Sequence, residues 1–187
     1  VYNTLSYLAC SPLSQAEIWT GSDDGLLHLT RNGGQHWQNI TPPNLQECLI
    51  NSIEVSPHVA GKAIITTTRY KFNDFSPAIF ITYNYGQTWK SITKGMATND
   101  FCRVVREDKK RQGLLYAGNE NGLYISFDDG ANWIPFQLNL PVVPINDLTI
   151  EDNDLIAATA GRAFWILDDI GPLQQTGNSL PKKPTLF

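Results

Sequence analysis

An eight-residue pattern recurs along this chain and constrains its fold more than any other feature. The copies read TRNGGQHW from residue 30, TYNYGQTW from residue 82 and SFDDGANW from residue 126. Each has a hydroxyl side chain, an Asp or Asn, a Gly and a Trp at the same offsets. A decayed fourth copy from residue 167 keeps Asp169 and Gly171. Repetition with a period of about 20–50 residues is typical of proteins built from stacked copies of one small unit. The chain is therefore predicted to contain four such units.

The residues around each copy indicate short β-strands. Two short apolar runs separated by a turn precede each copy, a β-rich run lies before them, and another run follows each Trp. Such an order of runs and turns is typical of hairpins. No stretch carries the 3.6-residue period of an amphipathic helix over several turns, so no long helix is expected. Strands are predicted at about 17–20, 25–30, 62–68, 78–82, 113–117, 122–126, 154–159 and 163–167.

Four short antiparallel strands in about 45 residues match one blade of a β-propeller. A β-sandwich also has short strands, but it does not require the same motif in every fourth turn. We therefore predict an all-β chain, a β-propeller segment of four blade-like, four-stranded antiparallel sheets whose last blade is incomplete. The predicted blades cover about 1–43, 44–94, 95–137 and 138–173, and a Pro-containing exit linker covers 174–187.

The repeated pattern has to turn the chain between the third and fourth strands of each blade. Its Gly can adopt a positive φ without a Cβ clash, and its Asp or Asn and its hydroxyl can accept hydrogen bonds from turn N–H groups. Its Trp is expected to bury about 200 Å² against its own blade. We predict a structural role, rather than catalysis or calcium binding, for Thr30, Asn32, Gly34, Trp37, Thr82, Asn84, Gly86, Trp89, Ser126, Asp128, Gly130 and Trp133.

The pattern resembles the Asp-box, or BNR repeat, of sialidase-like and sortilin-like propellers, over about residues 1–173. The likeness extends to large bacterial proteins described as glycosyl-hydrolase-like or sortilin-N-terminal-like, whose last blade looks like ATAGRAFWILDD at 158–169. The resemblance implies a propeller whose boxes lie away from the ligand face. It also implies an extracellular or cell-envelope location, although no signal peptide follows Val1. Sialidases, xyloglucan-cleaving enzymes, a photosystem assembly factor and sorting receptors share this fold, so it does not imply one chemistry.

Composition excludes several classes of function. The 187 residues carry 14 Lys and Arg against 18 Asp and Glu, a net charge of −4 without a basic cluster. Neither nucleic acid nor an anionic membrane surface is therefore an expected partner. No apolar run is long enough to span a membrane. The three cysteines lack C-x-x-C spacing and are expected to be buried on strands. Because His28, His36 and His58 also lack metal-ligand spacing and no cofactor motif is present, no metal or cofactor is predicted.

Candidate ligand-binding residues lie in the loops opposite the repeated turns, because successive hairpins alternate between the two faces of a propeller. Four carboxylates in these loops could supply the acid and base of glycoside hydrolysis, but turn stabilisation is the simpler interpretation. These carboxylates are Asp23, Asp24, Asp74 and Glu120. The candidates for ligand binding are Arg69, Tyr70, Phe72 and Arg162. For Arg162 the alternative is bonding between strands or blades.

Two hypotheses of function follow. The first is a non-catalytic binding or scaffold portion of a propeller in a larger secreted or envelope protein, with a glycan or protein ligand. The alternative is a glycoside hydrolase, sialidase-like or xyloglucanase-like, whose cleft is shared with blades outside this chain. No spacing here matches the arginine triad of sialidases. Both hypotheses predict an open ring that is completed by the remaining blades of the same polypeptide or by a second chain.

Overall fold

The computed structural model describes residues 3–177, and within them fifteen strands form four antiparallel sheets. We call these sheets blades 1 to 4. Blade 1 comprises β1 (Leu5–Ser11), β2 (Ser14–Ser22), β3 (Leu27–Thr30) and β4 (Gln38–Asn39), and blade 2 comprises β5 (Leu49–Val55), β6 (Ala63–Arg69), β7 (Asp74–Thr82) and β8 (Lys90–Ser91). Blade 3 comprises β9 (Cys102–Glu107), β10 (Leu115–Asn119), β11 (Leu123–Ser126) and β12 (Ile134–Pro135), and blade 4 comprises β13 (Ile145–Glu151), β14 (Asp154–Thr159) and β15 (Phe164–Leu167).

The strands lie where the sequence predicted them, with boundaries that differ by a few residues. Helical structure in residues 3–177 is limited to the 3-10 turn η1 (Tyr70–Phe72) and the five-residue helix α1 (Gly171–Gln175). The all-β prediction is therefore confirmed, as is the shorter last blade, which has three strands in the part of the chain that is described.

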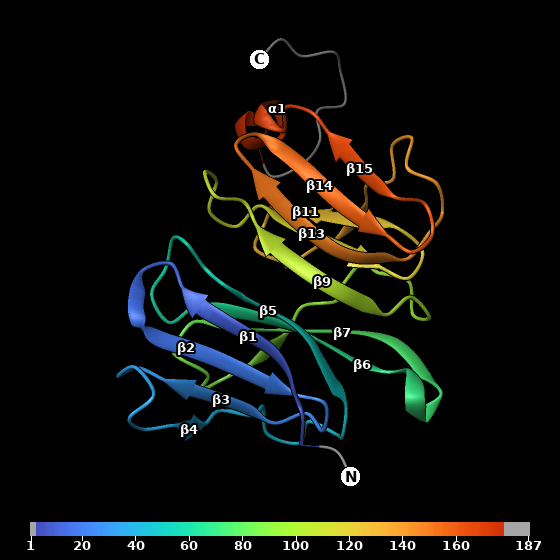
Figure 1. Ribbon diagram of the computed structural model, residues 1–187. Helices are drawn as coiled ribbons and strands as arrows, with labels where there is room; N and C mark the ends of the chain where they lie inside the picture. The colour runs from blue at the N-terminus through green and yellow to red at the C-terminus, as the bar shows by residue number, and fades with distance from the viewer. Residues whose placement is uncertain (1–2, 178–187) are drawn as a thin grey trace.

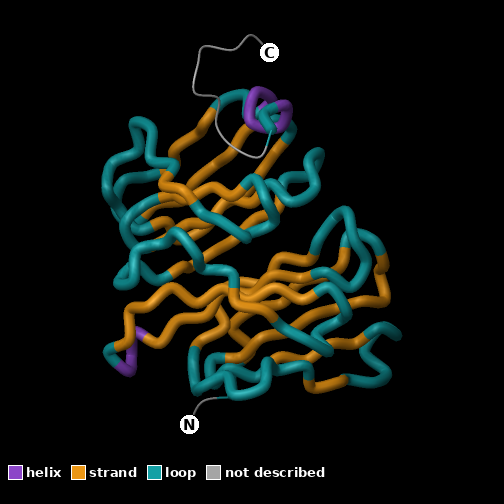
Figure 2. The backbone as a smooth tube through the Cα atoms, turned by 180° about the vertical axis from the view of Figure 1, so that it is seen from behind, coloured by secondary structure: helices purple, strands orange, loops and turns teal. Residues whose placement is uncertain are grey.

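The four blades lie next to one another in chain order (Figure 1). The first strands of successive blades are in contact, β1 with β5, β5 with β9 and β9 with β13, so they line a common inner edge. The β1–β2 and β13–β14 hairpins lie on one side of the molecule, and the β6–β7 and β14–β15 hairpins lie on the other (Figures 1 and 2). Blade 4 does not close the ring onto blade 1, as the sequence predicted.

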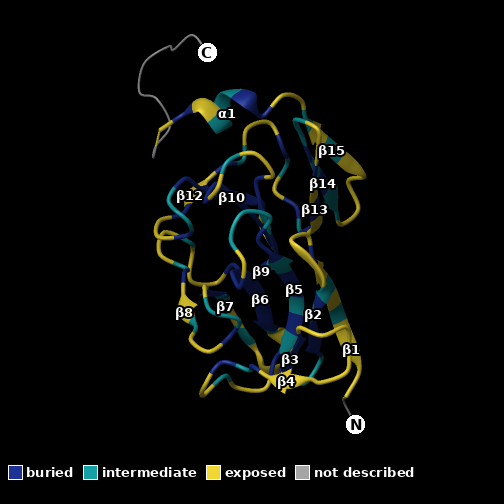
Figure 3. Ribbon diagram, turned by 90° about the vertical axis from the view of Figure 1, so that its left-hand side faces the viewer, coloured by how far each residue is buried: buried dark blue, intermediate teal, exposed yellow. Residues whose placement is uncertain are grey.

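Three apolar cores fill the spaces between neighbouring blades. Alternate residues of a strand point to opposite faces of its sheet, so Ile64 and Ile65 of β6 enter different cores. The core between blades 1 and 2 includes Trp19, Leu29, Ile53 and Ile65. The next two include Ile64, Ile81, Val105 and Leu115, and then Tyr116, Ile125, Leu148 and Leu155. The middle strands are consequently buried, whereas the outer strands β4 and β8 are exposed (Figure 3).

The repeated turns share one set of hydrogen bonds. In the second copy, Thr82 Oγ1 accepts the Gly86 N–H at 3.0 Å and donates to Asn84 Oδ1 at 3.0 Å, and Asn84 Oδ1 accepts the Thr88 N–H at 2.9 Å. The first and third copies form the same bonds at the corresponding positions. The glycine of each copy has a φ of 92°, 78° or 81° in chain order. Glycine occupies this left-handed region without the steric penalty that a Cβ brings.

The tryptophans of the repeated turns pack on the preceding blade rather than on their own. Trp89 donates its indole N–H to Ile40 O at 2.8 Å, and Trp133 donates to Ile92 O at 2.6 Å. Trp133 is only 2% exposed, whereas Trp37 is 46% exposed because no blade of this chain precedes it. The expectation that each Trp is buried against its own blade is therefore wrong, because burial of the ring depends on the neighbouring blade.

The cysteines show the same dependence on a neighbour. All three thiols are free, and Cys48 and Cys102 are buried as expected. Burial raises the pKa of the Cys48 thiol to about 11. Cys10 is exposed, contrary to expectation. Its neighbour Ala9 packs against the core between blades 1 and 2, so the strand alternation turns Cys10 to the open face of blade 1.

Replacing Gly86 with valine is expected to lower the free energy of unfolding by about 2–5 kcal/mol. A left-handed φ costs a residue with a Cβ about 1–2 kcal/mol, and overpacking costs about 1–3 kcal/mol. A Cβ at this position would lie 2.7 Å from Ile40 Cβ. Gly34→Val is the matched control, because Gly34 also has a positive φ but its Cβ would meet nothing closer than Trp37 Nε1 at 3.9 Å. Urea denaturation measures both losses, and equal losses would contradict this explanation.

The segment after blade 4 first folds back on the blades. Pro172 stands in the first turn of α1, where its missing N–H is not needed. Leu173 packs against the core between blades 3 and 4, and Arg111 Nη1 donates to Leu173 O at 2.7 Å. Within the predicted exit linker, Gln174 Nε2 donates to Asp108 Oδ2 at 3.0 Å and Arg111 Nη2 donates to Gly177 O at 3.0 Å, so residues 174–177 are docked on blade 3. Its remaining residues, 178–187, lie outside the described part of the chain.

Candidate ligand-binding site

The β6–β7 hairpin of blade 2 lies on the side opposite the β1–β2 hairpin (Figure 1), and it contains exposed aromatic residues. The turn η1 forms its tip, and Asn73 closes this turn with a φ of 58° while its N–H donates to Tyr70 O. Asn tolerates a left-handed φ better than most residues do. Tyr70, Phe72 and Phe75 are 42%, 47% and 45% exposed. Grouped exposed apolar side chains of this kind mark sites of ligand or partner binding.

Phe101, at the end of the link between blades 2 and 3, packs against two of these rings, those of Tyr70 and Phe75. It is 4% exposed, and its ring centroid lies 6.0 Å from that of Tyr70 and 6.2 Å from that of Phe75. The guanidinium of Arg103 lies 4.9 Å from the Phe101 centroid. We call Tyr70, Phe72, Phe75 and Phe101 the aromatic cluster. Sequence reasoning named the first two and missed Phe75 and Phe101, although Phe75 stands in the same hairpin.

Charged side chains hold the hairpin in place. Arg69 Nε lies 3.3 Å from Asp74 Oδ2, Arg69 Nη1 donates to Glu47 O at 2.8 Å, and the guanidinium lies 5.0 Å from the centroid of Phe72. The backbone N–H of Ser76 donates to Asp74 Oδ1 at 3.0 Å. This bond and, to a smaller extent, Arg69 hold the pKa of the Asp74 carboxyl below its usual value.

A second ion pair contacts the aromatic cluster at Phe101. Arg103 donates from Nε and Nη2 to Glu120 Oε2 at 2.9 and 2.6 Å. The same guanidinium lies over Phe101, so Glu120 orients the cation that packs on this ring. Charge-assisted pairs of this geometry fix the orientation of both side chains. Glu120 is thereby occupied by a structural contact.

The carboxylates of the β2–β3 turn are likewise tied to the turn. Asp23 Oδ1 accepts the N–H groups of Thr4 and Asn3 at 3.0 and 3.1 Å, and these bonds hold the Asp23 pKa below its usual value. Asp24 accepts the hydroxyl of Ser22. A general acid for glycoside hydrolysis needs a raised pKa, and the pKa shifts of Asp23 and Asp74 have the opposite direction. These contacts favour the turn interpretation.

The structure brings some of the predicted residues together and separates others. Asp23 lies beside Tyr70 and Phe72 at a small hollow lined by Asp23, Glu47, Cys48, Leu49, Thr68, Tyr70, Lys71 and Phe72. Arg162 is exposed on the β14–β15 turn of blade 4, where its carbonyl accepts the indole N–H of Trp165 at 3.0 Å. Arg162 therefore does not share the hollow with the other candidates.

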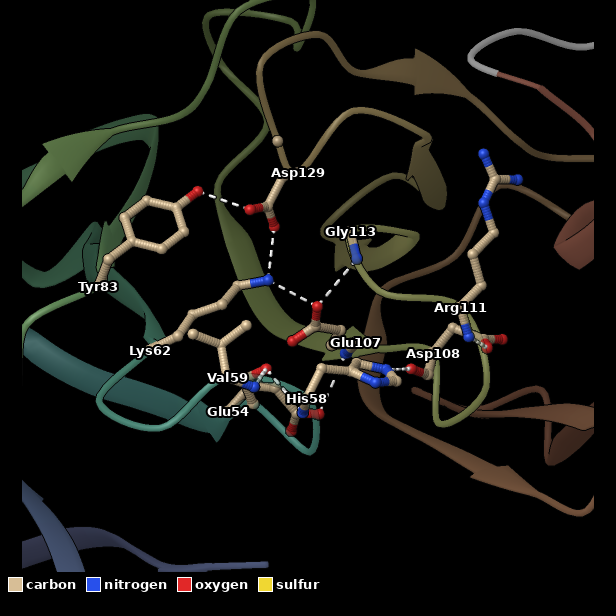
Figure 4. A network of polar contacts seen from close by, with 12 residues as sticks. Glu54, His58, Val59, Lys62, Tyr83, Glu107, Asp108, Arg111, Gly113 and Asp129 are labelled. Atoms are coloured by element: carbon tan, nitrogen blue, oxygen red, sulfur yellow. Dashed lines mark hydrogen bonds and ion pairs between the residues drawn. The ribbon is translucent and has the colours of Figure 1, made fainter. Parts of the chain in front are cut away.

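A buried polar network joins blades 2 and 3 near the third repeated turn (Figure 4). Lys62 Nζ lies 2.6 Å from Glu107 Oε1 and 2.7 Å from Asp129 Oδ1, and the Lys62 and Glu107 side chains are fully buried. Tyr83 Oη donates to Asp129 Oδ2 at 2.6 Å, and Gly113 N donates to Glu107 Oε1 at 2.9 Å. Sequence reasoning missed this network, because its charged members come from distant segments and form no motif. The Lys62 ammonium of blade 2 thus lies between the Glu107 and Asp129 carboxylates of blade 3, and this contact links the two blades.

The inner edge carries one more charged cluster, at a hollow of about 420 Å³ to which all four blades contribute. Arg106 Nη1 lies 3.5 Å from Glu54 Oε2, and Arg106 Nη2 lies 2.7 Å from Asp147 Oδ1 and 3.1 Å from Tyr7 Oη. Burial raises the pKa of the Glu54 carboxyl to about 7 in spite of Arg106. The guanidinium thus bonds to blades 1, 2 and 4 from its place on blade 3, which makes it a link along the inner edge.

Comparison with known proteins establishes the fold. No protein-family model and no curated protein matches the chain. Among solved structures, YCF48 bound to D1 peptide aligns with a TM-score of 0.65 and 18% identity, over 88% of this chain and 50% of that one. The GH74 xyloglucanase from Xanthomonas campestris aligns with a TM-score of 0.66 and 13% identity, over 88% of this chain and 28% of that one. The chain has the fold of a β-propeller segment.

A third match lies in the extracellular domain of a hybrid two-component system protein from B. thetaiotaomicron. Its TM-score is 0.64 at 17% identity, over 91% of this chain and 21% of that one. This chain thus spans half or less of each of the three propellers. At such identities the likeness shows the fold and not the activity. Neither helix within residues 3–177 has the length and apolar character that crossing a bilayer requires.

Proposed function

We propose that this chain is a non-catalytic binding and scaffold portion of a larger β-propeller, and that the aromatic cluster of blade 2 is its ligand-binding surface. The observation that carries the proposal is the contrast between exposed aromatic rings and occupied carboxylates. Tyr70, Phe72 and Phe75 present ring surface to solvent. Aromatic rings supply large contact area at a low cost in conformational entropy, which suits the binding of a glycan or of an extended peptide.

The remaining parts of the proposal rest on the resemblance and on the fold. The hydrogen bonds of the repeated turns support the interpretation of these turns as structural Asp-boxes, as in sortilin-like and glycosyl-hydrolase-like propellers. An extracellular or cell-envelope location agrees with the extracellular neighbour from B. thetaiotaomicron. The ring is completed by further blades, from the same polypeptide or from a second chain. No cofactor or metal is proposed to take part.

Titration of the full 187-residue chain tests the binding surface. Xyloglucan oligosaccharides and a displayed library of random peptides are the two probes, and NMR chemical shifts locate binding. We expect saturable binding of one probe and about a tenfold weaker affinity in Phe72→Ala, which corresponds to about 1.4 kcal/mol. Phe164→Ala is the matched control, because Phe164 is 74% exposed on blade 4, far from this hairpin in the chain. Absence of binding by both probes, or equal loss in both variants, would overturn the proposal.

The second candidate function is a glycoside hydrolase whose cleft this chain shares with other blades. A GH74 xyloglucanase is among the solved structures that share this fold, which is the reason to test for hydrolysis. In that case Asp23→Ala, Asp74→Ala or Glu120→Ala should abolish xyloglucan hydrolysis in an assembled propeller that circular dichroism shows to be still folded. Under the first proposal, these three variants leave any activity of the assembled protein unchanged.

A further inference from the structure

We propose that the face of blade 1 turned away from blade 2 is a docking surface for a further, complete four-stranded blade. The outer strand of that blade would place an aliphatic side chain over Gly34 and a backbone carbonyl on the Trp37 indole N–H. The inference deepens the proposal that this chain works inside a larger propeller. It specifies the groups that a neighbouring blade would place against blade 1.

The two junctions already present within the chain show how one blade docks on the next. At the first, the Trp89 indole N–H donates to Ile40 O at 2.8 Å, and a Cβ on Gly86 would lie 2.7 Å from Ile40 Cβ. At the second, the Trp133 indole N–H donates to Ile92 O at 2.6 Å, and a Cβ on Gly130 would lie 2.5 Å from the Cδ1 atom of the same isoleucine. Both isoleucines stand three residues after the Trp of their own blade.

The first repeated turn has the same residues without a partner. Trp37 is 46% exposed, and within residues 3–177 it makes no counterpart of the indole hydrogen bonds of Trp89 and Trp133. A Cβ on Gly34 would meet only Trp37 within 4 Å. Gly34 and Trp37 thus have the arrangement that Gly86 and Trp89 have at the first junction. What they lack within residues 3–177 is a counterpart of Ile40 with its carbonyl group.

The strand β1 extends the same apolar face. Tyr7 and Ala9 pack toward blade 2, so Leu8 and Cys10 point to the opposite face. Leu8 is 58% exposed, and Cys10 is exposed as well. The corresponding residue of Leu8 in blade 2 is Ile53, which is 2% exposed in the core between blades 1 and 2. Leu8 and Cys10 therefore extend the exposed apolar surface around Trp37, and an exposed apolar surface of this kind is typical of an interaction site.

The geometry selects a complete blade rather than blade 4 of a second copy. The carbonyl and the aliphatic side chain of both junctions follow the fourth strand, β4 or β8, of the earlier blade. Blade 4 has only the three strands β13 to β15 within the described residues. Within residues 3–177, blade 4 therefore offers no outer strand to the Trp37 indole.

The test adds a blade before β1. A second copy of residues 1–43 is placed directly before Val1 of the full chain, and Trp37→Phe in the added copy leaves the original Trp37 as the reporter. NMR measures hydrogen exchange of the indole N–H groups. We expect exchange at the original Trp37 to slow by about a hundredfold on addition of the blade, to the range of Trp89 and Trp133, which report that the chain is folded. Ile40→Asp in the added copy alone should abolish this protection.

Two results would overturn the inference. The first is fast exchange at the original Trp37 in an extended chain whose Trp89 and Trp133 remain protected. The second is protection of Trp37 in the unextended chain that increases with protein concentration, which would make a second copy the occupant. The ligand titration of blade 2 does not depend on Trp37, so failure of this inference and failure of the proposed function are distinguishable.

Discussion

Replacing Trp133 with alanine is expected to lower the free energy of unfolding by about 3–5 kcal/mol, the range for a large buried aromatic side chain. Trp133 is 2% exposed and packs in the core between blades 2 and 3. Its removal leaves a cavity there and also removes the hydrogen bond to Ile92 O. Urea denaturation, followed by far-ultraviolet circular dichroism, measures the loss.

Trp37→Ala is the matched control for this prediction. Trp37 stands at the same position of its repeated turn, but it is 46% exposed and packs on no preceding blade. Its replacement is expected to cost about 1 kcal/mol or less in the 187-residue chain, as is usual for surface positions. Similar losses in the two variants would show that the blade junction does not determine the contribution of this tryptophan.

Replacing Lys62 with methionine is expected to lower the free energy of unfolding by about 3–5 kcal/mol, the usual consequence of removing one partner from a buried ion pair. The variant retains a long apolar side chain but leaves Glu107 and Asp129 without their cation. Glu107 is fully buried, so its carboxylate would have no counter-charge and little access to water. The same denaturation experiment at neutral pH measures this effect.

Lys109→Met is the control for the loss of charge. Lys109 Nζ lies 3.0 Å from Glu151 Oε2, but the two side chains are 55% and 70% exposed. Exposed ion pairs contribute about 0–1 kcal/mol, because water screens both partners. A loss in Lys62→Met as small as that in Lys109→Met would show that water reaches the Lys62 network in solution.

The sequence by itself determined the local features of this protein. Thr82, Asn84 and Gly86 form their hydrogen bonds within one turn, so composition and spacing were sufficient to predict where the chain turns. The short apolar runs between the turns predicted the strands for the same reason, since strand formation and side-chain alternation depend on adjacent residues. The open ring followed from the number of repeats, and the short last blade followed from the proline-containing tail after the decayed fourth copy.

Part of the candidate site could also be predicted from the sequence. The hairpin with Tyr70 and Phe72 differs from the other hairpins in length and in its aromatic residues, and the structure exposes both rings. Phe101 was not predicted as part of the site, because it lies in a different loop and joins the cluster only through ring packing. The contacts of Asp23 with Thr4 and of Glu120 with Arg103, which occupy these carboxylates, likewise join separate segments.

Only the tertiary structure decided the properties that depend on a neighbouring blade. Trp37 and Trp133 occupy the same place in the same motif, yet one is half exposed and the other is buried. Lys62 and Glu107 are 45 residues apart and meet only because two blades pack together. Burial and ion pairing arise from contacts between separate segments, which spacing along one segment does not encode.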